Sequence, residues 1–307
     1  MRNGPAQGGW RAFHIYLPHS LQTGFLCDVI GPLVRDTGGR DRFFFLRYWQ
    51  GGPHIRLRID GALEATLEAV RTSLASAVPQ LTTELSDEYA YEVSLQSELA
   101  DLEGEQPAEI RPAGTIEPAD YVPEYRKYGG TVGVDIAERV FCETSVAVLD
   151  LLSAQADREL KAPIGEAMRI MAMSLRGSGL GVEESREFLG RYEAWWRRYV
   201  PPGYDDMWPS LYDRTRESVT NLCRSVWLEG RTDAFHDIYA NALASAHSAH
   251  GEATDGDLAQ LRLGDTTYAG CLANYLHTTN NRLGIIPAGE AFVAHVMRRS
   301  LAELKPS

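Results

Sequence analysis

Residues 43–59, FFFLRYWQGGPHIRLRI, decide how this sequence folds. Aromatic and branched residues with high strand preference fill 43–49 and 54–59, and Gln50-Gly51-Gly52-Pro53 separates the two runs. A short turn rich in glycine between two such runs is typical of a β-hairpin. The stretch therefore predicts two antiparallel strands.

The second run alternates, so its side chains point to opposite faces of the sheet. One face carries His54, Arg56 and Arg58, and the other carries Ile55, Leu57 and Ile59. Two guanidiniums about 7 Å apart on one face suit a dicarboxylate or two carboxylates. A solvated strand face with surface ion pairs explains the spacing equally well.

Elements on both sides extend the hairpin into an α+β half. Residues 10–17 alternate as a half-buried strand, and apolar residues at helical spacing predict a helix over 63–74. Ser20 is expected to cap a helix that buries Leu21, Phe25, Val29 and Leu33 and stops near Gly38-Gly39. A weaker strand pattern lies at 110–116. This order predicts a ferredoxin-like split βαβ arrangement.

A proline-rich stretch, 104–123, predicts the hinge to a second half. Beyond it, apolar stripes at helical spacing predict an all-helical half. The stripes are Val134, Ala137, Phe141, Val148 and Leu152; Phe188, Tyr192, Trp195 and Tyr199; and Val293, Met297, Leu301 and Leu304. The sequence thus predicts an α+β half at 1–123 and a helical half at 124–307, in one compact functional unit.

Composition excludes several classes of protein. The 307 residues carry a formal charge of −12, which disfavours direct binding of nucleic acid. Four scattered cysteines without CxxC spacing are expected to be small buried residues in a reducing cytoplasm. We find neither a signal-like apolar segment at the N-terminus nor a run of about 20 apolar residues, so we expect a cytoplasmic protein without a membrane span.

Two further clusters could carry chemistry. The segment 124–130, EYRKYGG, brings Glu124 close to Lys127 and ends in glycines that free the backbone, although a charged linker turn would look the same. The segment 277–284, HTTNNRLG, places His277 at a helix end, where its imidazole could act near neutral pH. A single helical histidine is more often structural.

Other site patterns are absent from the sequence. The pair His247 and His250 has i, i+3 spacing but no carboxylate beside it, so it does not indicate a metal site. The sequence has no GxGxxG, GxSxG or P-loop. The pair Trp195-Trp196 is expected in the core, with Arg197 and Arg198 on its solvent side.

Taken together and in this order, the FFFLRY and GPHIRLR runs, EYRKYGG and HTTNNRLG resemble the C-terminal domain of lantibiotic dehydratases, which also occurs as a stand-alone protein in thiopeptide biosynthesis. The resemblance implies elimination of glutamate from Ser or Thr of a precursor peptide that a partner has glutamylated with glutamyl-tRNA. It places the carboxylate-binding arginine of the family at Arg58, the ExxRYGG motif at 124–130 and the late histidine at His277. The family's arginine before Tyr-Gly-Gly is Lys127 here, which keeps the charge but loses the bidentate fork.

The resemblance also implies roles and partners. Catalytic roles fall on His277, Glu124 and Lys127, and substrate binding on Arg56, Arg58, His54, Arg126, Asn281 and Arg282. We expect no metal and no cofactor, because β-elimination from an activated ester needs only acid, base and charge neutralisation. The expected partners are the precursor peptide, with its leader and core, and a separate glutamylating subunit, and the chain could form a homodimer.

Two alternatives stay open. The same fold serves as a pyridine synthase, which joins two dehydroalanines in a formal [4+2] cycloaddition and expels the leader peptide. A non-catalytic subunit that binds the peptide by strand addition is the third possibility.

Overall fold

A computed structural model describes residues 9–36, 42–60, 64–78, 82–155, 163–250, 258 and 260–304. The chain divides into two compact units. Met1–Val122 and Val148–Lys161 form the first, called the sheet unit below, and Pro123–Ala147 and Ala162–Ser307 form the second, called the helical unit. Each unit is described by itself.

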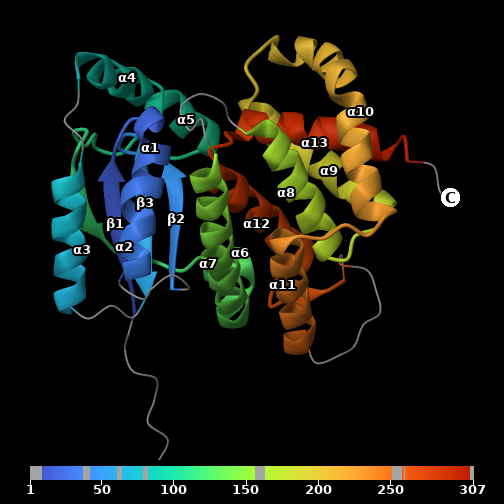
Figure 1. Cartoon of the computed structure of the whole chain (residues 1–307), viewed down its shortest axis with the longest axis horizontal. Coiled ribbons are helices and arrows are strands. Elements are labelled where there is room, and N and C mark those ends of the chain that lie inside the picture. The colour runs from blue at the N-terminus through green and yellow to red at the C-terminus, as the bar shows by residue number, and fades with distance from the viewer. Residues whose placement is uncertain are drawn as a thin grey trace, which may run out of the picture. The chain divides into compact units, whose positions relative to one another are not determined.

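The sheet unit is built on four antiparallel strands. They are β1 (Trp10–Tyr16), β2 (Phe43–Tyr48), β3 (His54–Asp60) and β4 (Ile116–Ala119), in the order β2-β3-β1-β4 (Figure 1). The predicted hairpin is confirmed, and Gly51 and Gly52 take positive φ in its turn. The strand predicted at 110–116 was misplaced, because a turn at Pro112–Thr115 occupies that segment and β4 starts only at Ile116.

The first helix is interrupted by a π-helical turn. α1 (His19–Phe25), η1 (Leu26–Ile30) and α2 (Gly31–Asp36) follow one another without a break. A π turn adds one residue to the repeat, so the buried stripe moves from the predicted Val29 and Leu33 to Ile30 and Val34. The predicted helix end at Gly38-Gly39 lies outside the described residues.

The prediction of Ser20 as the helix cap was wrong. Ser20 lies inside α1, and carboxylates of another helix take up the free N–H groups at this helix start. Glu88 accepts from the Ser20 amide at 3.1 Å and Glu92 from the His19 amide at 3.2 Å. Two acids at a helix N-terminus serve the same purpose as a cap residue.

Helices cover the apolar face of the sheet. Arg47, whose side chain points to that face, donates a 3.0 Å hydrogen bond to Thr23 of α1. α3 (Glu64–Ala77) matches the predicted helix over 63–74, of which residue 63 lies outside the described part, and it contacts β4 and η1. α4 (Thr83–Ser94) and α5 (Gln96–Glu103) were not predicted. They reach the hairpin turn, where Gln96 accepts from the Gly51 amide.

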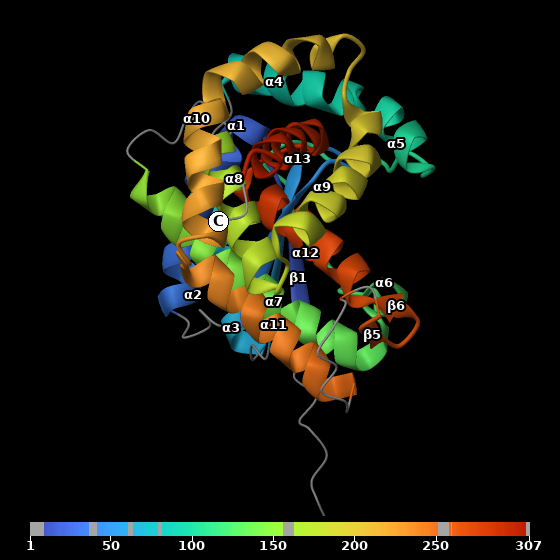
Figure 2. The ribbon, with the colours of Figure 1, turned by 90° about the vertical axis from the view of Figure 1, so that its right-hand side faces the viewer.

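The helical unit confirms the predicted helical half. The helices are α6 (Tyr125–Tyr128), α7 (Gly130–Ala154, whose last residues belong to the sheet unit), α8 (Ile164–Gly177), α9 (Val182–Trp196), α10 (Trp208–Trp227), α11 (Ala234–His250), α12 (Tyr268–Leu283) and α13 (Pro287–Leu301). α13 packs between α9 and α10 (Figure 2), and α8 packs against α11. The predicted stripes of α7 and α13 are buried.

Two details of this unit differ from the prediction. A small hairpin, β5 (Arg262–Leu263) and β6 (Thr266–Thr267), turns at Gly264, so the half is not entirely helical. Trp195 is 61% exposed instead of buried, because the apolar stripe of α9 continues from Tyr192 to Trp196 at i, i+4 spacing. Arg197 and Arg198 are exposed as predicted.

The predicted burial of the cysteines is confirmed, since Cys27, Cys142, Cys223 and Cys271 are all buried and free. Among the described residues, no helix has the length and apolar character needed to cross a membrane.

Candidate functional site

The face of the sheet opposite α1 carries the predicted cations. The register places His54, Arg56 and Arg58 of β3 on this face, together with Tyr48 of β2 and His14 of β1. Because neighbouring strands are antiparallel and paired in register, these side chains form rows across the sheet. The structure thus brings the three predicted residues of β3 together with partners that the sequence did not single out.

Arg56 and His54 hold one another in place. The Arg56 guanidinium lies 3.4 Å from the centre of the Tyr48 ring, and its Nε donates to His54 Nε2 at 3.2 Å. His54 Nδ1 lies 2.8 Å from the Gly52 carbonyl oxygen, to which it donates. The acceptor role of Nε2 and the donor role of Nδ1 fix His54 as the neutral Nδ1–H tautomer.

Both histidines of this face are neutral. Burial, and then the charges of Arg56 and Arg58, lower the pKa of His14 to about 4. Burial, opposed by the hydrogen bond to the Gly52 carbonyl and assisted by Arg56, lowers the pKa of His54 to about 3. The rings lie 4.7 Å apart between their centres. The positive charge of the face at neutral pH therefore comes from the arginines.

Arg58 lies in an aromatic slot. It is 9% exposed, and its guanidinium carbon lies 5.3 Å from the ring centres of both Phe44 and Tyr121. Trp10 packs edge-on against both rings. A guanidinium flanked by aromatic rings is partly desolvated, so a carboxylate that reaches it meets a strong cation.

A carboxylate completes the face on the β4 side. Glu117 stands opposite His14, accepts from the Tyr16 hydroxyl at 3.2 Å and pairs with Arg111 at 3.1 Å. Burial, and then Glu117, raise the pKa of Tyr16 to about 12, so this hydroxyl stays protonated and donates. His14 and Glu117 could not be singled out from the sequence, because the register that aligns them with Arg56 depends on pairings between distant strands.

The segment 124–130 forms a tight turn at the start of α7. Glu124 and Lys127 form an ion pair of 3.3 Å, as predicted from their spacing, and the Lys127 ammonium lies 5.6 Å from the Tyr128 ring centre. Arg126 is exposed, and its carbonyl accepts from the Thr266 hydroxyl at 2.9 Å. Gly129 follows with φ of 83° and passes directly against β5.

His277 belongs to a hydrogen-bonded cluster of the helical unit that is centred on Glu290. Its Nδ1 lies 2.8 Å from Glu290 Oε1, and the Glu290 side chain is fully buried. Tyr192 and Asn280 donate to the other oxygen of the same carboxylate. Trp196 stacks on the imidazole with 4.3 Å between ring centres.

The other predicted residues of α12 face different surroundings. Arg282 is fully buried, donates to Ser145 at 2.9 Å and lies 5.1 Å from the Phe141 ring centre. Asn281 is half-buried. His277 shares one face of the helix with Asn280 and Asn281, at i, i+3 and i, i+4 spacing, while Arg282 points to another face. The role of Arg282 and Asn281 in substrate binding stays a prediction.

Glu290, Tyr192 and Trp196 were missed as site residues. Glu290 follows Pro287 in the first turn of α13, where an acid is expected at any helix start, and Tyr192 belonged to an apolar stripe. The signal that was present is an acid, a tyrosine and a histidine that stand among the apolar residues of their helices. Among the described residues, no group of three or more His, Cys, Asp or Glu side chains could hold a metal ion.

Fold and site together define an α+β protein with an arginine-bearing sheet face in one unit and a histidine–carboxylate pair in the other. The family model of the lantibiotic biosynthesis dehydratase C-terminal domain matches residues 10–301, so the chain belongs to this family. The resemblance predicted from the motifs is thereby confirmed, as is a role in the maturation of ribosomally made peptides.

Solved structures share the fold. The pyridine synthase TbtD from thiomuracin biosynthesis is 19% identical with a TM-score of 0.69, over 96% of this chain and 98% of its own. TsrL is 18% identical with a TM-score of 0.61, over 97% and 95%. The tRNA-dependent lantibiotic dehydratase MibB from Microbispora sp. 107891 is 20% identical with a TM-score of 0.56, and the match covers 98% of this chain but 28% of MibB. No curated protein sequence matches.

Proposed function

We propose that the chain eliminates glutamate from glutamylated Ser or Thr residues of a precursor peptide and leaves dehydroamino acids. Arg56 and Arg58 bind the carboxylate of glutamate, and His54 orients Arg56. His277 is the base, and Glu124 and Lys127 are the other proposed catalytic residues. Arg126, Asn281 and Arg282 complete the proposed substrate-binding set, and the Arg282 guanidinium is buried against Ser145 and Phe141.

The observation that carries this proposal is the pair of arginines on one sheet face beside two neutral histidines. Arg56 is held by Tyr48 and His54, and Arg58 stands in its aromatic slot, so both guanidiniums are oriented before a ligand arrives. Because the pKa values of His14 and His54 lie at about 4 and about 3, these rings add no competing titration near pH 7. A preorganised cationic surface of this kind suits a departing carboxylate.

The chemistry needs no group beyond acid, base and cations. His277 Nε2 takes the α-proton of the modified residue, and the C–H electron pair becomes the Cα=Cβ double bond. The Cβ–O bond breaks, and its pair leaves with glutamate as a carboxylate. His277 then releases its proton to water, so the base is regenerated.

The second candidate is a pyridine synthase. The similarity to TbtD spans nearly the whole of both chains, and this observation favours it. Lys127, which replaces the family's arginine, also favours this candidate, because a lysine cannot bind a carboxylate through two parallel hydrogen bonds as an arginine does. Identity of 19% supports the fold and does not choose between the two reactions.

Other parts of the proposal concern partners, compartment and fold detail. The precursor peptide and a separate glutamylating subunit are the proposed partners, a homodimer is a further possibility, and the buried free cysteines support a reducing cytoplasm. The strand order β2-β3-β1-β4 with antiparallel pairing supports a ferredoxin-like sheet to which α4 and α5 have been added.

The experiment offers two substrates to the purified protein. A glutamylated peptide should release free glutamate and gain a double bond at each modified residue, as measured by mass spectrometry. Release of leader peptide from a substrate that contains dehydroalanines, without glutamate release, would assign pyridine synthesis. Tight peptide binding with neither product would assign the non-catalytic role.

Arg58→Ala and Arg58→Lys test the sheet face. Both should abolish glutamate release, because lysine restores the charge without the two-pronged contact. Arg42→Ala is the matched control: Arg42 is an exposed arginine of the same hairpin, paired with Asp60 at 2.8 Å, and turnover should be unchanged. Normal turnover in the folded Arg58 variants would refute the carboxylate site.

A further inference from the structure

Glu290 is an unusual carboxylate because it is completely buried and yet surrounded by neutral donors. Its side chain has no exposed surface, and it receives contacts from His277 at 2.8 Å, Asn280 at 3.3 Å and the Tyr192 hydroxyl. An ionised carboxylate in such a place is costly unless hydrogen bonds satisfy it. Two helices, α9 and α12, supply these bonds.

The donors are divided between the two oxygens. Tyr192 and Asn280 both donate to Oε2, and only His277 contacts Oε1 among the described residues. Burial, and then the charge of Glu290, raise the pKa of Tyr192 well above its ordinary value, so the tyrosine keeps its proton and donates it. The carboxylate is therefore fixed in orientation, with Oε1 left for the imidazole.

This contact fixes the tautomer of His277. An ionised carboxylate accepts hydrogen bonds and cannot donate, so the proton of the neutral imidazole is on Nδ1. Nε2 then carries the lone pair. Trp196 stacks on the ring at an angle of 24°, which fixes the ring plane as well. The side chain of His277 is 25% exposed, so a substrate can reach the ring.

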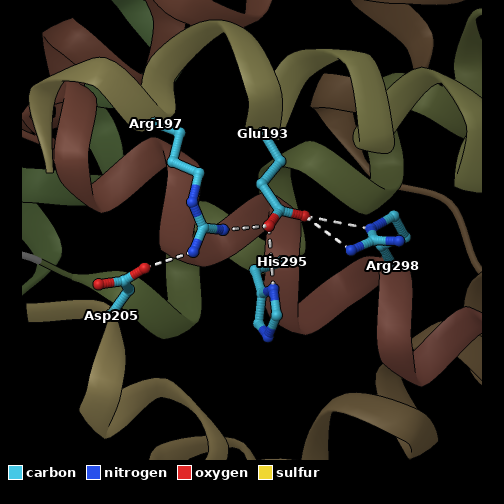
Figure 3. A network of polar contacts seen from close by, with 5 residues as sticks. All are labelled: Glu193, Arg197, Asp205, His295 and Arg298. Atoms are coloured by element: carbon cyan, nitrogen blue, oxygen red, sulfur yellow. Dashed lines mark hydrogen bonds and ion pairs between the residues drawn. The ribbon is translucent and has the colours of Figure 1, made fainter.

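A second histidine–glutamate pair in the same unit shows the contrast. Glu193 contacts His295 at 3.1 Å, but it also binds Arg197 at 3.0 Å and Arg298 at 3.0 Å (Figure 3). Its charge is already compensated by two guanidiniums. The hydrogen-bond partners of Glu290 within the described residues include no arginine or lysine, so an imidazolium at His277 would be its first cationic partner.

We propose that Glu290 is a positioning residue that holds His277 as the Nδ1–H tautomer and stabilises the imidazolium formed when Nε2 accepts a proton. Tyr192 and Asn280 hold Glu290 for this purpose. The arrangement makes His277 a general base for a carbon acid, a C–H bond next to a peptide carbonyl. Only the identity of that proton rests on the proposed function.

Glu290→Gln provides a sharp test, because the two donors at Oε2 dictate how the new amide must lie. Tyr192 and Asn280 require an oxygen, so the amide NH₂ turns toward His277 and donates to Nδ1. The imidazole must then carry its proton on Nε2 and loses its capacity as a base. We expect ¹⁵N NMR to report Nδ1–H in the natural protein and Nε2–H in the variant.

The rate of glutamate release should fall when His277 changes to the Nε2–H tautomer. We expect glutamate release to fall by about 10⁴-fold in Glu290→Gln, as for the acid partner of a catalytic triad, with KM little changed. Glu290→Asp restores an acceptor and should recover part of the rate. Glu193→Gln is the matched control, since it removes a second buried carboxylate of the same unit and should leave the His277 tautomer as it is.

The NMR measurement is independent of the reaction. An Nε2–H tautomer in the natural protein, or an unchanged Nδ1–H tautomer in Glu290→Gln, overturns the positioning role. The expected tautomer switch in a protein that releases no glutamate would instead overturn the proposed function and leave the positioning role supported. The measurement on the natural protein needs no variant to fold.

Discussion

Gly129 and Gly130 allow the packing of the segment 124–130 to be measured by a pair of matched substitutions. Both have a positive φ, of 83° and 84°, which side-chain-bearing residues rarely adopt. A Cβ at Gly129 would lie 1.9 Å from the Leu263 carbonyl oxygen, whereas a Cβ at Gly130 would meet nothing within 4 Å. Alanine must therefore adopt an unfavourable positive φ at both positions, but its Cβ meets a close contact only at residue 129.

The magnitudes follow from these two contributions. A non-glycine residue in the left-handed region costs about 1–2 kcal/mol, which is the full expectation for Gly130→Ala. At Gly129 the opposing atoms are backbone of β5, which cannot rotate away as a side chain would. Forcing extra volume into a close-packed contact costs about a further 1–3 kcal/mol, so Gly129→Ala should cost about 2–5 kcal/mol.

Urea unfolding followed by tryptophan fluorescence measures both costs. We expect the midpoint of Gly129→Ala to lie well below that of Gly130→Ala, with similar slopes. Activity should fall with Gly129→Ala as well, because a displaced β5 moves the turn that carries Glu124 and Lys127. Equal destabilisation of the two variants would refute the close contact between residue 129 and β5.

Three further predictions concern titration and reactivity. Burial alone would raise the pKa of Glu193, but His295, Arg298 and the hydrogen bonds they make hold that pKa below its ordinary 4.5. The ionised Glu193 therefore stabilises the folded protein fully above pH 4.5, and this stabilisation is lost as the pH falls through the lowered pKa. The unfolding free energy of Glu193→Gln, measured with urea, should therefore depend less on pH in this acidic range. Because the pKa values of His14 and His54 lie below 6.5 in the folded protein, the unfolded chain binds more protons than the folded chain does at mildly acidic pH. The free energy of unfolding should therefore decline as the pH falls from 6.5 toward 4. Equal unfolding free energies at pH 7 and pH 5 would contradict this. Burial raises the pKa of the Cys223 and Cys271 thiols to about 12, so a thiol reagent at pH 8 should label them only after denaturation, and rapid labelling of the folded protein would show that the helices open.

The sheet could be predicted because its information is local. Alternation in 54–59 separates the cationic and apolar faces within a single strand, and the Gly-Gly-Pro turn fixes the hairpin. The helix register at 26–30 could not be predicted in the same way. The π turn there displaces the buried stripe by one residue, and a regular helical period places the stripe on Val29 and Leu33 instead.

In the candidate site, too, residues could be predicted where the information is local in the sequence and not where it is long-range. Arg56 and Arg58 could be predicted because alternation along one strand places them on the same face. The Glu124–Lys127 pair could be predicted from its i, i+3 spacing. Glu290 and Tyr192 act on His277 across three helices that are far apart in sequence. Nothing in the pattern of α13 distinguishes the carboxylate that binds His277 from an ordinary acid in a first helical turn.

The division of α7 has a consequence for how this protein could be recombined. The chain passes between the two units at three points, after Val122, after Ala147 and after Lys161, and the second point lies inside a continuous helix. A gene cut once near residue 123 would therefore deprive the sheet unit of Val148 and Leu152, which are buried. A chimera in which a relative supplies the helical unit should fold only if the end of α7 still matches the sheet unit against which it packs. We therefore expect the two units to be exchanged together more readily than one at a time.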